Sequence, residues 1–159
     1  MSVLHEIREA NAGYAAGFAK GELSMPPTRR FAVVTCMDAR LDPARFLGLE
    51  EGDAHVIRNA GGIVNDETIR SLVISHHLLG TQEAVVIGHS DCGMLTFTNG
   101  DLHAKLGSES QSIDFQPFPD VAERVRRSVA TIGTSPLLPG SFAATGFVYD
   151  VRSGTLDAV

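Results

Sequence analysis

The sequence has only two cysteines, no long hydrophobic run and no basic leader segment. No apolar stretch comes near the roughly 20 residues that a membrane-spanning helix needs, and residues 1–9 lack the basic start and apolar core of a signal peptide. We therefore expect a cytoplasmic protein, in which thiols stay reduced. This setting favours thiolate chemistry over a disulfide for Cys36 and Cys92.

The chain also lacks an excess of basic residues. Its formal net charge is −6, which argues against nucleic acid as a partner because nucleic acid rewards clustered Lys and Arg. No internal repeat or low-complexity segment is present. The 159 residues are 43% hydrophobic and 20% charged, which is usual for a soluble globular protein. This length predicts a single domain over residues 1–159, with a core that removes about two thirds of the unfolded surface from water.

Apolar runs and helical patterns alternate along most of the chain. The first run, residues 31–35, has no polar alternation, which predicts a strand covered on both faces. The predicted strands cover residues 31–35, 54–58, 84–88, 146–151 and 155–159, and the predicted helices cover residues 42–48, 66–79, 93 onward and 120–132. This order predicts an α/β fold with a mostly parallel central sheet flanked by helices and an antiparallel edge strand at the C-terminus.

The N-terminal segment predicts an amphipathic helix over residues 2–20. Its apolar residues fall near helical spacing: Val3, Leu4, Ile7, Tyr14 and Phe18. Gly13 and Gly17 lower the helix propensity and could let another backbone approach closely. Two interpretations stay open, a helix on its own core and a helix on a partner subunit. We expect residues 1–24 to form a helical arm that packs on a partner.

Two of the predicted strands run directly into chemically active residues. Cys36-Met37-Asp38-Ala39-Arg40 follows the first strand, and His89-Ser90-Asp91-Cys92-Gly93 follows the third. In open α/β sheets the functional crevice lies beyond the carboxyl ends of the strands. Cys and His are zinc ligands, and catalytic zinc sites have three protein ligands and an open fourth position. Cys36, His89 and Cys92 therefore predict a metal site.

Other interpretations of these residues stay open. A free Cys is often a small buried hydrophobe, and a structural zinc would need a fourth Cys or His. The chain has no third cysteine, and four other histidines lack ligand-like spacing: His55, His76, His77 and His103. The open position therefore favours catalysis over a non-catalytic, zinc-stabilised regulatory protein. A thiol redox protein is disfavoured because no Cys-x-x-Cys pair exists.

Asp38 and Arg40 are the next candidates for the site. Alternate residues of an extended segment point the same way, so both can share a face with Cys36. Arg40 can hold Asp38 in a charge-assisted, bidentate pair, although a surface ion pair of little energetic value is the plainer alternative. Beside a metal, an ionised Asp38 can accept a hydrogen bond from zinc-bound water. In a closed state, Asp38 would instead become the fourth ligand.

The two motifs together resemble those of the β-class carbonic anhydrases, which read C-x-D-x-R and then H-x-x-C. Arg58-Asn59-Ala60-Gly61-Gly62 also matches that family, and the resemblance covers about residues 28–159. It implies one zinc ion per subunit on Cys36, His89 and Cys92, with Asp38 and Arg40 as the catalytic dyad. It also implies the reversible hydration of CO₂ to bicarbonate and a proton by zinc-bound hydroxide.

The resemblance further implies an assembly and a set of rival substrates. It implies a homodimer or a dimer of dimers, with N-terminal helices exchanged between subunits. Carbonyl sulfide hydrolases and carbon disulfide hydrolases use the same fold and zinc site. The alternative function is therefore hydrolysis of carbonyl sulfide to CO₂ and H₂S, since zinc hydroxide attacks a linear, electrophilic cumulene in each case.

Overall fold

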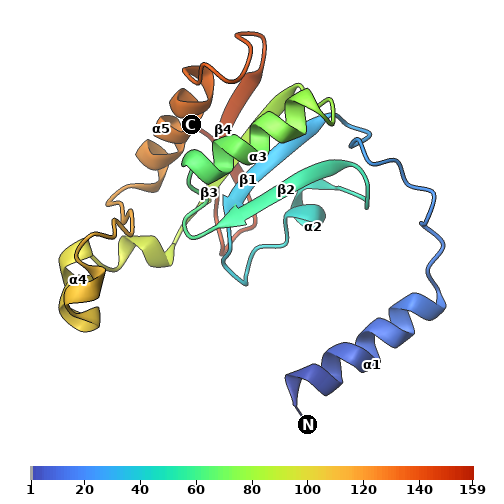
Figure 1. The fold of residues 1–159 in the computed structure, drawn as a ribbon, viewed down its shortest axis with the longest axis horizontal. Coiled ribbons are helices and arrows are strands. Elements are labelled where there is room, and N and C mark those ends of the chain that lie inside the picture. The colour runs from blue at the N-terminus through green and yellow to red at the C-terminus, as the bar shows by residue number, and fades with distance from the viewer. Residues whose placement is uncertain (1) are drawn as a thin grey trace.

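The computed structural model describes residues 2–159, and Met1, the first residue of the predicted arm, lies outside them. Within this range the chain forms a five-stranded sheet with helices packed on it (Figure 1). The strands are β1 (Phe31–Cys36), β2 (Ala54–Asn59), β3 (Glu83–His89), β4 (Ala143–Tyr149) and β5 (Leu156–Ala158). The α-helices are α1 (Val3–Ala16), α2 (Pro43–Leu47), α3 (Asp66–His77), α4 (Asn99–Leu106) and α5 (Val121–Gly133).

The sheet has the strand order β2-β1-β3-β4-β5. β1 pairs in parallel with β2 and β3, β3 pairs in parallel with β4, and only β5 runs antiparallel to its neighbour. This confirms the predicted mostly parallel sheet with an antiparallel C-terminal edge. Because β1 and β3 are adjacent and parallel, the residues that follow Cys36 and His89 emerge at the same edge of the sheet.

The core lies on both faces of β1, as its apolar run predicts. All six of its residues are buried. Ala32 and Val34 face one layer, in which Leu72 of α3 and Val125 of α5 pack on the sheet. Phe31 and Val33 face the opposite layer, which includes residues of α2. Strand β1 is therefore clamped between two apolar layers, which holds its carboxyl end in place.

Two glycines let α5 sit unusually close to the sheet. A Cβ on Gly146 would lie 2.6 Å from Val125 Cγ1, and a Cβ on Gly88 would lie 2.7 Å from Val121 Cγ1. Real Cβ atoms essentially never approach other heavy atoms so closely. The two glycines therefore set the distance between α5 and the strands that it covers.

The boundaries of α2 follow from local chemistry. The side chain of Asp42 accepts a hydrogen bond from the backbone N–H of Arg45, and Pro43 occupies the first turn. Gly48 ends the helix in the left-handed conformation with φ 61°. These residues turn the chain away from the end of β1 and confirm the predicted helix over residues 42–48.

The prediction that a helix starts at Gly93 is wrong. Residues Gly93–Leu95 form a single 3₁₀ turn, and α4 begins only at Asn99. The reason is a capping box, in which Thr98 and Asp101 satisfy each other's backbone N–H groups. The last long strand also begins earlier than predicted, at Ala143, because it extends its ladder along β3.

Helix α1 buries none of its residues against the rest of the chain. It ends at Ala16, earlier than the predicted residue 20, and it projects away from the sheet (Figure 1). Glu51 contacts both this helix and the segment that follows it: it accepts a hydrogen bond from the Tyr14 hydroxyl at 3.1 Å and pairs with Lys20 at 3.0 Å. None of the helices among residues 2–159 has the length and apolarity that crossing a membrane requires.

Candidate metal centre

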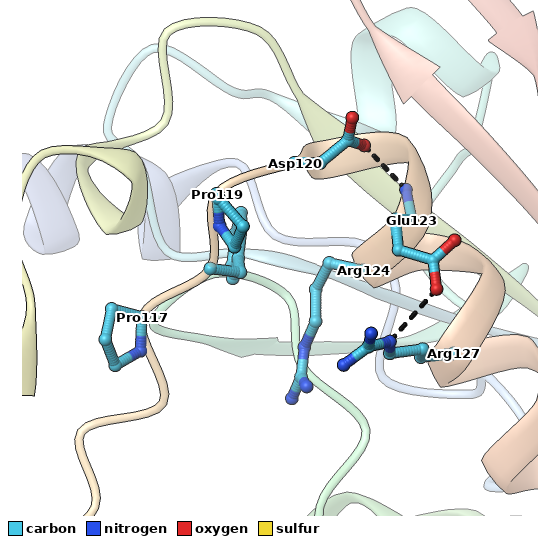
Figure 2. A pocket seen from close by; sticks show the side chains of 7 residues that line it. Pro117, Pro119, Asp120, Glu123, Arg124 and Arg127 are labelled. Atoms are coloured by element: carbon cyan, nitrogen blue, oxygen red, sulfur yellow. Dashed lines mark hydrogen bonds and ion pairs between the residues drawn. The ribbon is translucent and has the colours of Figure 1, made fainter.

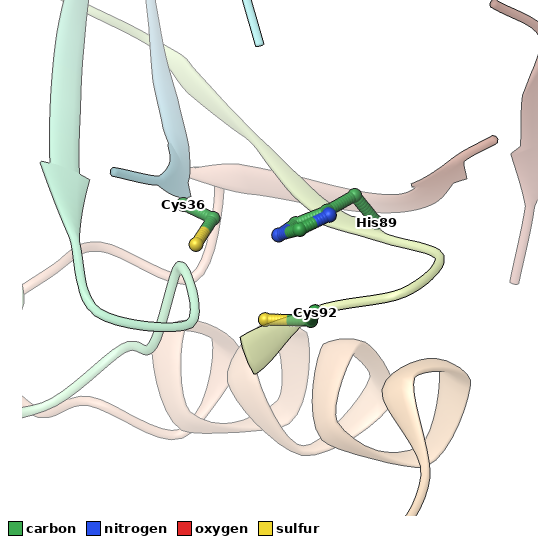
Figure 3. A group of neighbouring side chains, drawn as sticks. All are labelled: Cys36, His89 and Cys92. Atoms are coloured by element: carbon green, nitrogen blue, oxygen red, sulfur yellow. The ribbon is translucent and has the colours of Figure 1, made fainter. Parts of the chain in front are cut away.

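Three potential metal ligands converge at the carboxyl edge of the sheet (Figure 3). Cys36 ends β1, His89 ends β3, and Cys92 follows β3 after a short loop. One ligand atom from each residue lies within 4.8 Å of the others, and all three side chains are buried. The structure therefore brings together the three residues that the sequence predicts, in an arrangement that could hold one metal ion.

The groups around the sulfur of Cys36 lower the pKa of its thiol. The neighbouring Cys92 thiol has the largest effect, and His89 and backbone N–H groups add to it, although burial opposes it. One of the backbone donors is the N–H of Gly61, 3.4 Å from Cys36 Sγ. The same interaction with Cys36, together with burial, raises the pKa of Cys92. The two sulfurs therefore interact directly within the cluster.

The imidazole of His89 is oriented for ligation through Nε2. Its Nδ1 lies 2.9 Å from the backbone carbonyl of Ser90, and a carbonyl can only accept, so Nδ1 carries the proton. Within the described chain, Nε2 is buried without a hydrogen-bond partner. Buried polar atoms are nearly always paired. An orphaned nitrogen that faces two sulfurs is explained by a metal ion, so the donor set fits one.

The cluster favours positive charge at its centre. Burial favours the neutral imidazole of His89, but the neighbouring Cys36 sulfur outweighs this effect and raises the pKa of His89. Sulfur and imidazole nitrogen are the donors that zinc prefers, with four-coordinate geometry. Three protein donors leave one position of such a geometry without a ligand from the cluster.

Asp38 is held beside the cluster by Arg40. Arg40 Nε donates to Asp38 Oδ1 at 3.0 Å and Nη2 donates to Oδ2 at 2.8 Å, while the Arg40 backbone N–H adds a bond of 2.9 Å to Oδ1. These contacts hold the pKa of Asp38 far below its usual range. Asp38 Oδ2 lies 3.8 Å from His89 Nε2. An ionised carboxylate thus faces the cluster, and the predicted bidentate geometry is present.

Arg58 fixes the backbone between Cys36 and Asp38. Its Nε donates to the carbonyl of Cys36 at 3.0 Å, and its Nη2 donates to the carbonyl of Asp38 at 2.7 Å. A planar guanidinium that bonds two carbonyls of one segment restrains both. Sequence motifs alone give Arg58 no role, because its function depends on β2 lying next to β1.

A cavity of about 280 Å³ opens onto the cluster. Its lining residues are Cys36, Met37, Asp38, Ala60, Gly61, Cys92, Gly93, Met94 and Phe97. Beyond the cluster and Asp38, every residue in this lining is apolar or glycine. The cavity therefore suits a small, uncharged molecule whose only polar interactions are with the cluster and Asp38.

Four other histidines are engaged away from the cluster. One ring nitrogen of each lies near a partner: His55 with Ser75 Oγ at 2.7 Å, His76 with the Thr81 carbonyl at 2.6 Å, His77 with the Leu137 carbonyl at 2.9 Å and His103 with the Ile113 carbonyl at 2.9 Å. Over residues 2–159, Cys36, His89 and Cys92 form the one group of three or more side chains spaced to hold a metal.

A smaller hollow of about 110 Å³ lies at the start of α5 (Figure 2). Asp120 accepts from the backbone N–H of Glu123 at 2.8 Å, and Glu123 pairs with Arg127 at 3.0 Å. Arg124 donates to Gln116 Oε1 at 3.2 Å. Charges of both signs line this hollow, and Glu123 and Arg127 neutralise each other, so it offers a ligand no field of a single sign.

Comparison with known proteins identifies the family. Residues 31–114 match the family model described as carbonic anhydrase. Beta-carbonic anhydrase 1 of Mycobacterium tuberculosis is 46% identical over 162 residues, which cover 100% of this chain and 99% of that protein. The chain belongs to the β-carbonic anhydrase family.

Structural comparison places the whole chain within the β-carbonic anhydrase fold. A crystal structure of carbonic anhydrase from Streptococcus mutans superposes with a TM-score of 0.94 at 45% identity, over 100% of this chain and 98% of that one. A carbon disulfide hydrolase of Saccharolobus solfataricus is also 49% identical over 160 residues, which cover 83% of this chain and 78% of that protein. Relatives of this chain thus carry names for two different substrates.

Two glycines of the family motif explain why the turn after β2 can approach the cluster. Gly61 and Gly62 have φ of 83° and 62°, which favours glycine. A Cβ on Gly62 would lie 2.9 Å from the backbone N of Cys36, and one on Gly61 would lie 2.9 Å from Phe118 Cε1. This turn therefore needs both a left-handed backbone and close approach to its neighbours. The hydrogen bond from Gly61 to sulfur is a role that the sequence does not indicate.

We expect Gly61→Ala to destabilise the fold by about 1–3 kcal/mol, since it combines a left-handed backbone with overpacking. Gly100→Ala is the matched control, because Gly100 lies in α4 and a Cβ there meets only Thr98 Oγ1 at 3.6 Å. That control should gain up to about 1 kcal/mol from helix propensity. Urea unfolding of both variants measures the difference, and equal stabilities would contradict the assigned crowding at Gly61.

Proposed function

We propose that this chain is a zinc-dependent carbonic anhydrase that reversibly hydrates CO₂ to bicarbonate and a proton. The observation that carries the proposal is the buried Cys36–His89–Cys92 cluster, with the unpaired His89 Nε2 beside a carboxylate that an arginine holds in place. Family membership and the 46% identical relative named beta-carbonic anhydrase 1 support the same conclusion.

In this proposal Cys36, His89 and Cys92 each hold the same zinc ion, one per subunit. Two sulfurs and one imidazole match the donor preference of zinc better than that of magnesium or calcium, which take oxygen. When bound, zinc lowers the pKa of a coordinated water, so that hydroxide becomes available as a nucleophile. The Gly61 N–H and the Ser90 carbonyl hold the Cys36 sulfur and the His89 ring in their ligating orientations.

Asp38 and Arg40 form the proposed catalytic dyad. Asp38 stays ionised because Arg40 donates a hydrogen bond to each of its oxygens. The ionised carboxylate can therefore accept a hydrogen bond from a group that approaches the cluster, and this bond orients that group. The same pairing competes with any direct bond from Asp38 to the metal. Release of Asp38 from Arg40 would let the carboxylate become the fourth ligand, which closes the site.

The apolar cavity supports a linear, uncharged substrate. Met94, Phe97 and Ala60 exclude water from the space beside the cluster without offering a hydrogen bond to bicarbonate. CO₂ is therefore favoured on entry, whereas the charged product is better solvated outside. Three donors rather than four in the cluster also favour an enzyme over a non-catalytic zinc protein.

Hydrolysis of carbonyl sulfide or carbon disulfide is the second candidate function. The 49% identical relative named carbon disulfide hydrolase favours it, and the proposed ligands would be the same. Carbonyl sulfide and carbon disulfide are linear and apolar like CO₂, so the cavity lining accepts all three. We place CO₂ first because beta-carbonic anhydrase 1 is 46% identical over 100% of this chain, whereas the 49% identical carbon disulfide hydrolase matches 83% of it.

We also propose that the protein is at least a homodimer, with residues 1–24 as an arm on the partner subunit. Val3, Leu4 and Ile7 are each more than half exposed, and α1 buries nothing on its own chain. An apolar stripe of this kind gains stability only when another surface covers it. A dimer of dimers would use the same arms. The free, buried thiols suit a reducing, cytoplasmic setting.

Metal analysis tests the ligand set. We expect about one zinc per chain in the purified protein and a near-total loss of zinc in Cys36→Ser and His89→Ala, because each removes a donor that the others cannot replace. His103→Ala is the matched control, since His103 bonds the Ile113 carbonyl instead, and it should keep its zinc. Full zinc content in His89→Ala by mass spectrometry would refute the assignment.

Parallel stopped-flow CO₂ hydration and sulfide-release assays test the substrate and the dyad. We expect CO₂ hydration to dominate, and we expect Asp38→Asn to keep zinc but lose roughly 10–100-fold in activity, the usual effect of removing a group that orients a metal site. Asp157→Asn, on the exposed edge strand β5, is the control. Full activity in Asp38→Asn would sink the dyad, and sulfide release as the faster reaction would favour the second function.

Analytical ultracentrifugation tests the arm. We expect the full chain to sediment as a dimer or larger, and we expect Ile7→Asp to shift it toward monomer, because a charge on the apolar stripe cannot be buried cheaply. Glu6→Gln, the neighbouring exposed residue, should leave the assembly unchanged. A monomeric full chain would contradict the proposed arm exchange.

A further inference from the structure

Residues 89–92, here called the metal loop, carry two of the three cluster side chains. Asp91 has an unusual backbone conformation within this loop. It lies between His89 and Cys92 with φ 53°, which few residues other than glycine adopt, although Asp and Asn tolerate it. Its backbone carbonyl accepts a hydrogen bond from Arg40 Nη2 at 3.0 Å. The same nitrogen donates to Asp38 Oδ2 at 2.8 Å. Arg40 Nη2 therefore joins the carboxylate of Asp38 to the backbone carbonyl of Asp91.

The turn between β4 and β5 holds Asp91 from outside. Arg152 donates from Nε and Nη2 to Asp91 Oδ2, at 3.3 and 3.1 Å. Arg152 itself is placed by Asp150, whose Oδ1 accepts the Arg152 backbone N–H at 2.7 Å. Next to Asp91, Ser90 Oγ accepts the backbone N–H of Val151 at 3.0 Å. Three contacts thus tie the metal loop to one turn.

We propose that Asp91 and Arg152 are positioning residues for the Asp38–Arg40 dyad. The ion pair between them keeps the Asp91 carbonyl aimed at Arg40, and that carbonyl keeps the Arg40 guanidinium in the plane that bonds both oxygens of Asp38. The functional part of this inference rests on the proposed zinc chemistry. The structural part, the orientation of Arg40, stands independently of it.

The plainer alternative is a surface ion pair without consequence. Arg152 is 82% exposed, and exposed pairs are worth about 0–1 kcal/mol. The position of this pair distinguishes it from others on the surface, because its acceptor belongs to a residue with a left-handed backbone between two cluster side chains. A stabilisation of this size corresponds to at most about a fivefold effect, so the expected change is modest and must be measured against a matched control.

Nuclear magnetic resonance of the purified, metal-loaded protein tests the orientation directly. The Arg40 Nε–H resonance, identified by its absence in Arg40→Lys, should move and exchange faster with solvent in Arg152→Ala and in Asp91→Asn. Arg152→Lys should restore it only in part, because an ammonium lacks the two-nitrogen fork. Arg70→Ala, which removes a similar exposed arginine paired with Glu67 on α3, should leave the resonance unchanged.

Kinetics then test the functional part. We expect Arg152→Ala and Asp91→Asn each to lower kcat about two- to fivefold with KM unchanged, and the double variant to match the single ones, because the two residues act as a unit. An Arg40 resonance and kcat equal to those of Arg70→Ala would overturn the proposal. A wild-type protein without CO₂ hydration would refute the proposed function, while the resonance would still decide the positioning role.

Discussion

The burial of two sulfurs and an imidazole nitrogen within 4.8 Å of one another is the constraint on which the rest of the structure depends. Each unsatisfied polar group in such a place costs about 1–3 kcal/mol. The fold meets part of that cost with a backbone N–H for Cys36 and a carbonyl for His89 Nδ1, and the proposed metal ion would meet the rest. The sheet positions Cys36 and His89, the turn at Gly61 supplies the N–H, and Ser90 in the metal loop supplies the carbonyl.

Two arginines near the cluster, Arg58 and Arg40, orient different parts of the segment that follows β1. Arg58 bonds the main chain on either side of Met37, so it sets where the segment runs. Arg40 bonds the carboxylate of Asp38, so it sets where the charge points. Both tasks need a planar fork of donors, which lysine lacks. Neither arginine lines the apolar cavity, and their charges therefore act on the site without filling it.

Much of the fold follows from local patterns in the sequence. Residues 31–35 and 84–88 are strands because apolar runs of that length bury on both faces, and the motif spacing then places Cys36 and His89 at one edge. The start of α4 was predicted wrongly because the capping box at Thr98 stops the helix from reaching back to Gly93. The role of Asp91 depends on a left-handed backbone and on a turn some 60 residues away, and no local pattern encodes either.

Gly88 shows how closely packing and chemistry are joined in this fold. It immediately precedes His89, and α5 occupies the space where its side chain would be. The distance between α5 and the sheet therefore also affects the position of the His89 backbone, and with it the position of the imidazole. Val121 and Val125 therefore lie one residue away from a proposed metal ligand, although neither belongs to the lining of the cavity.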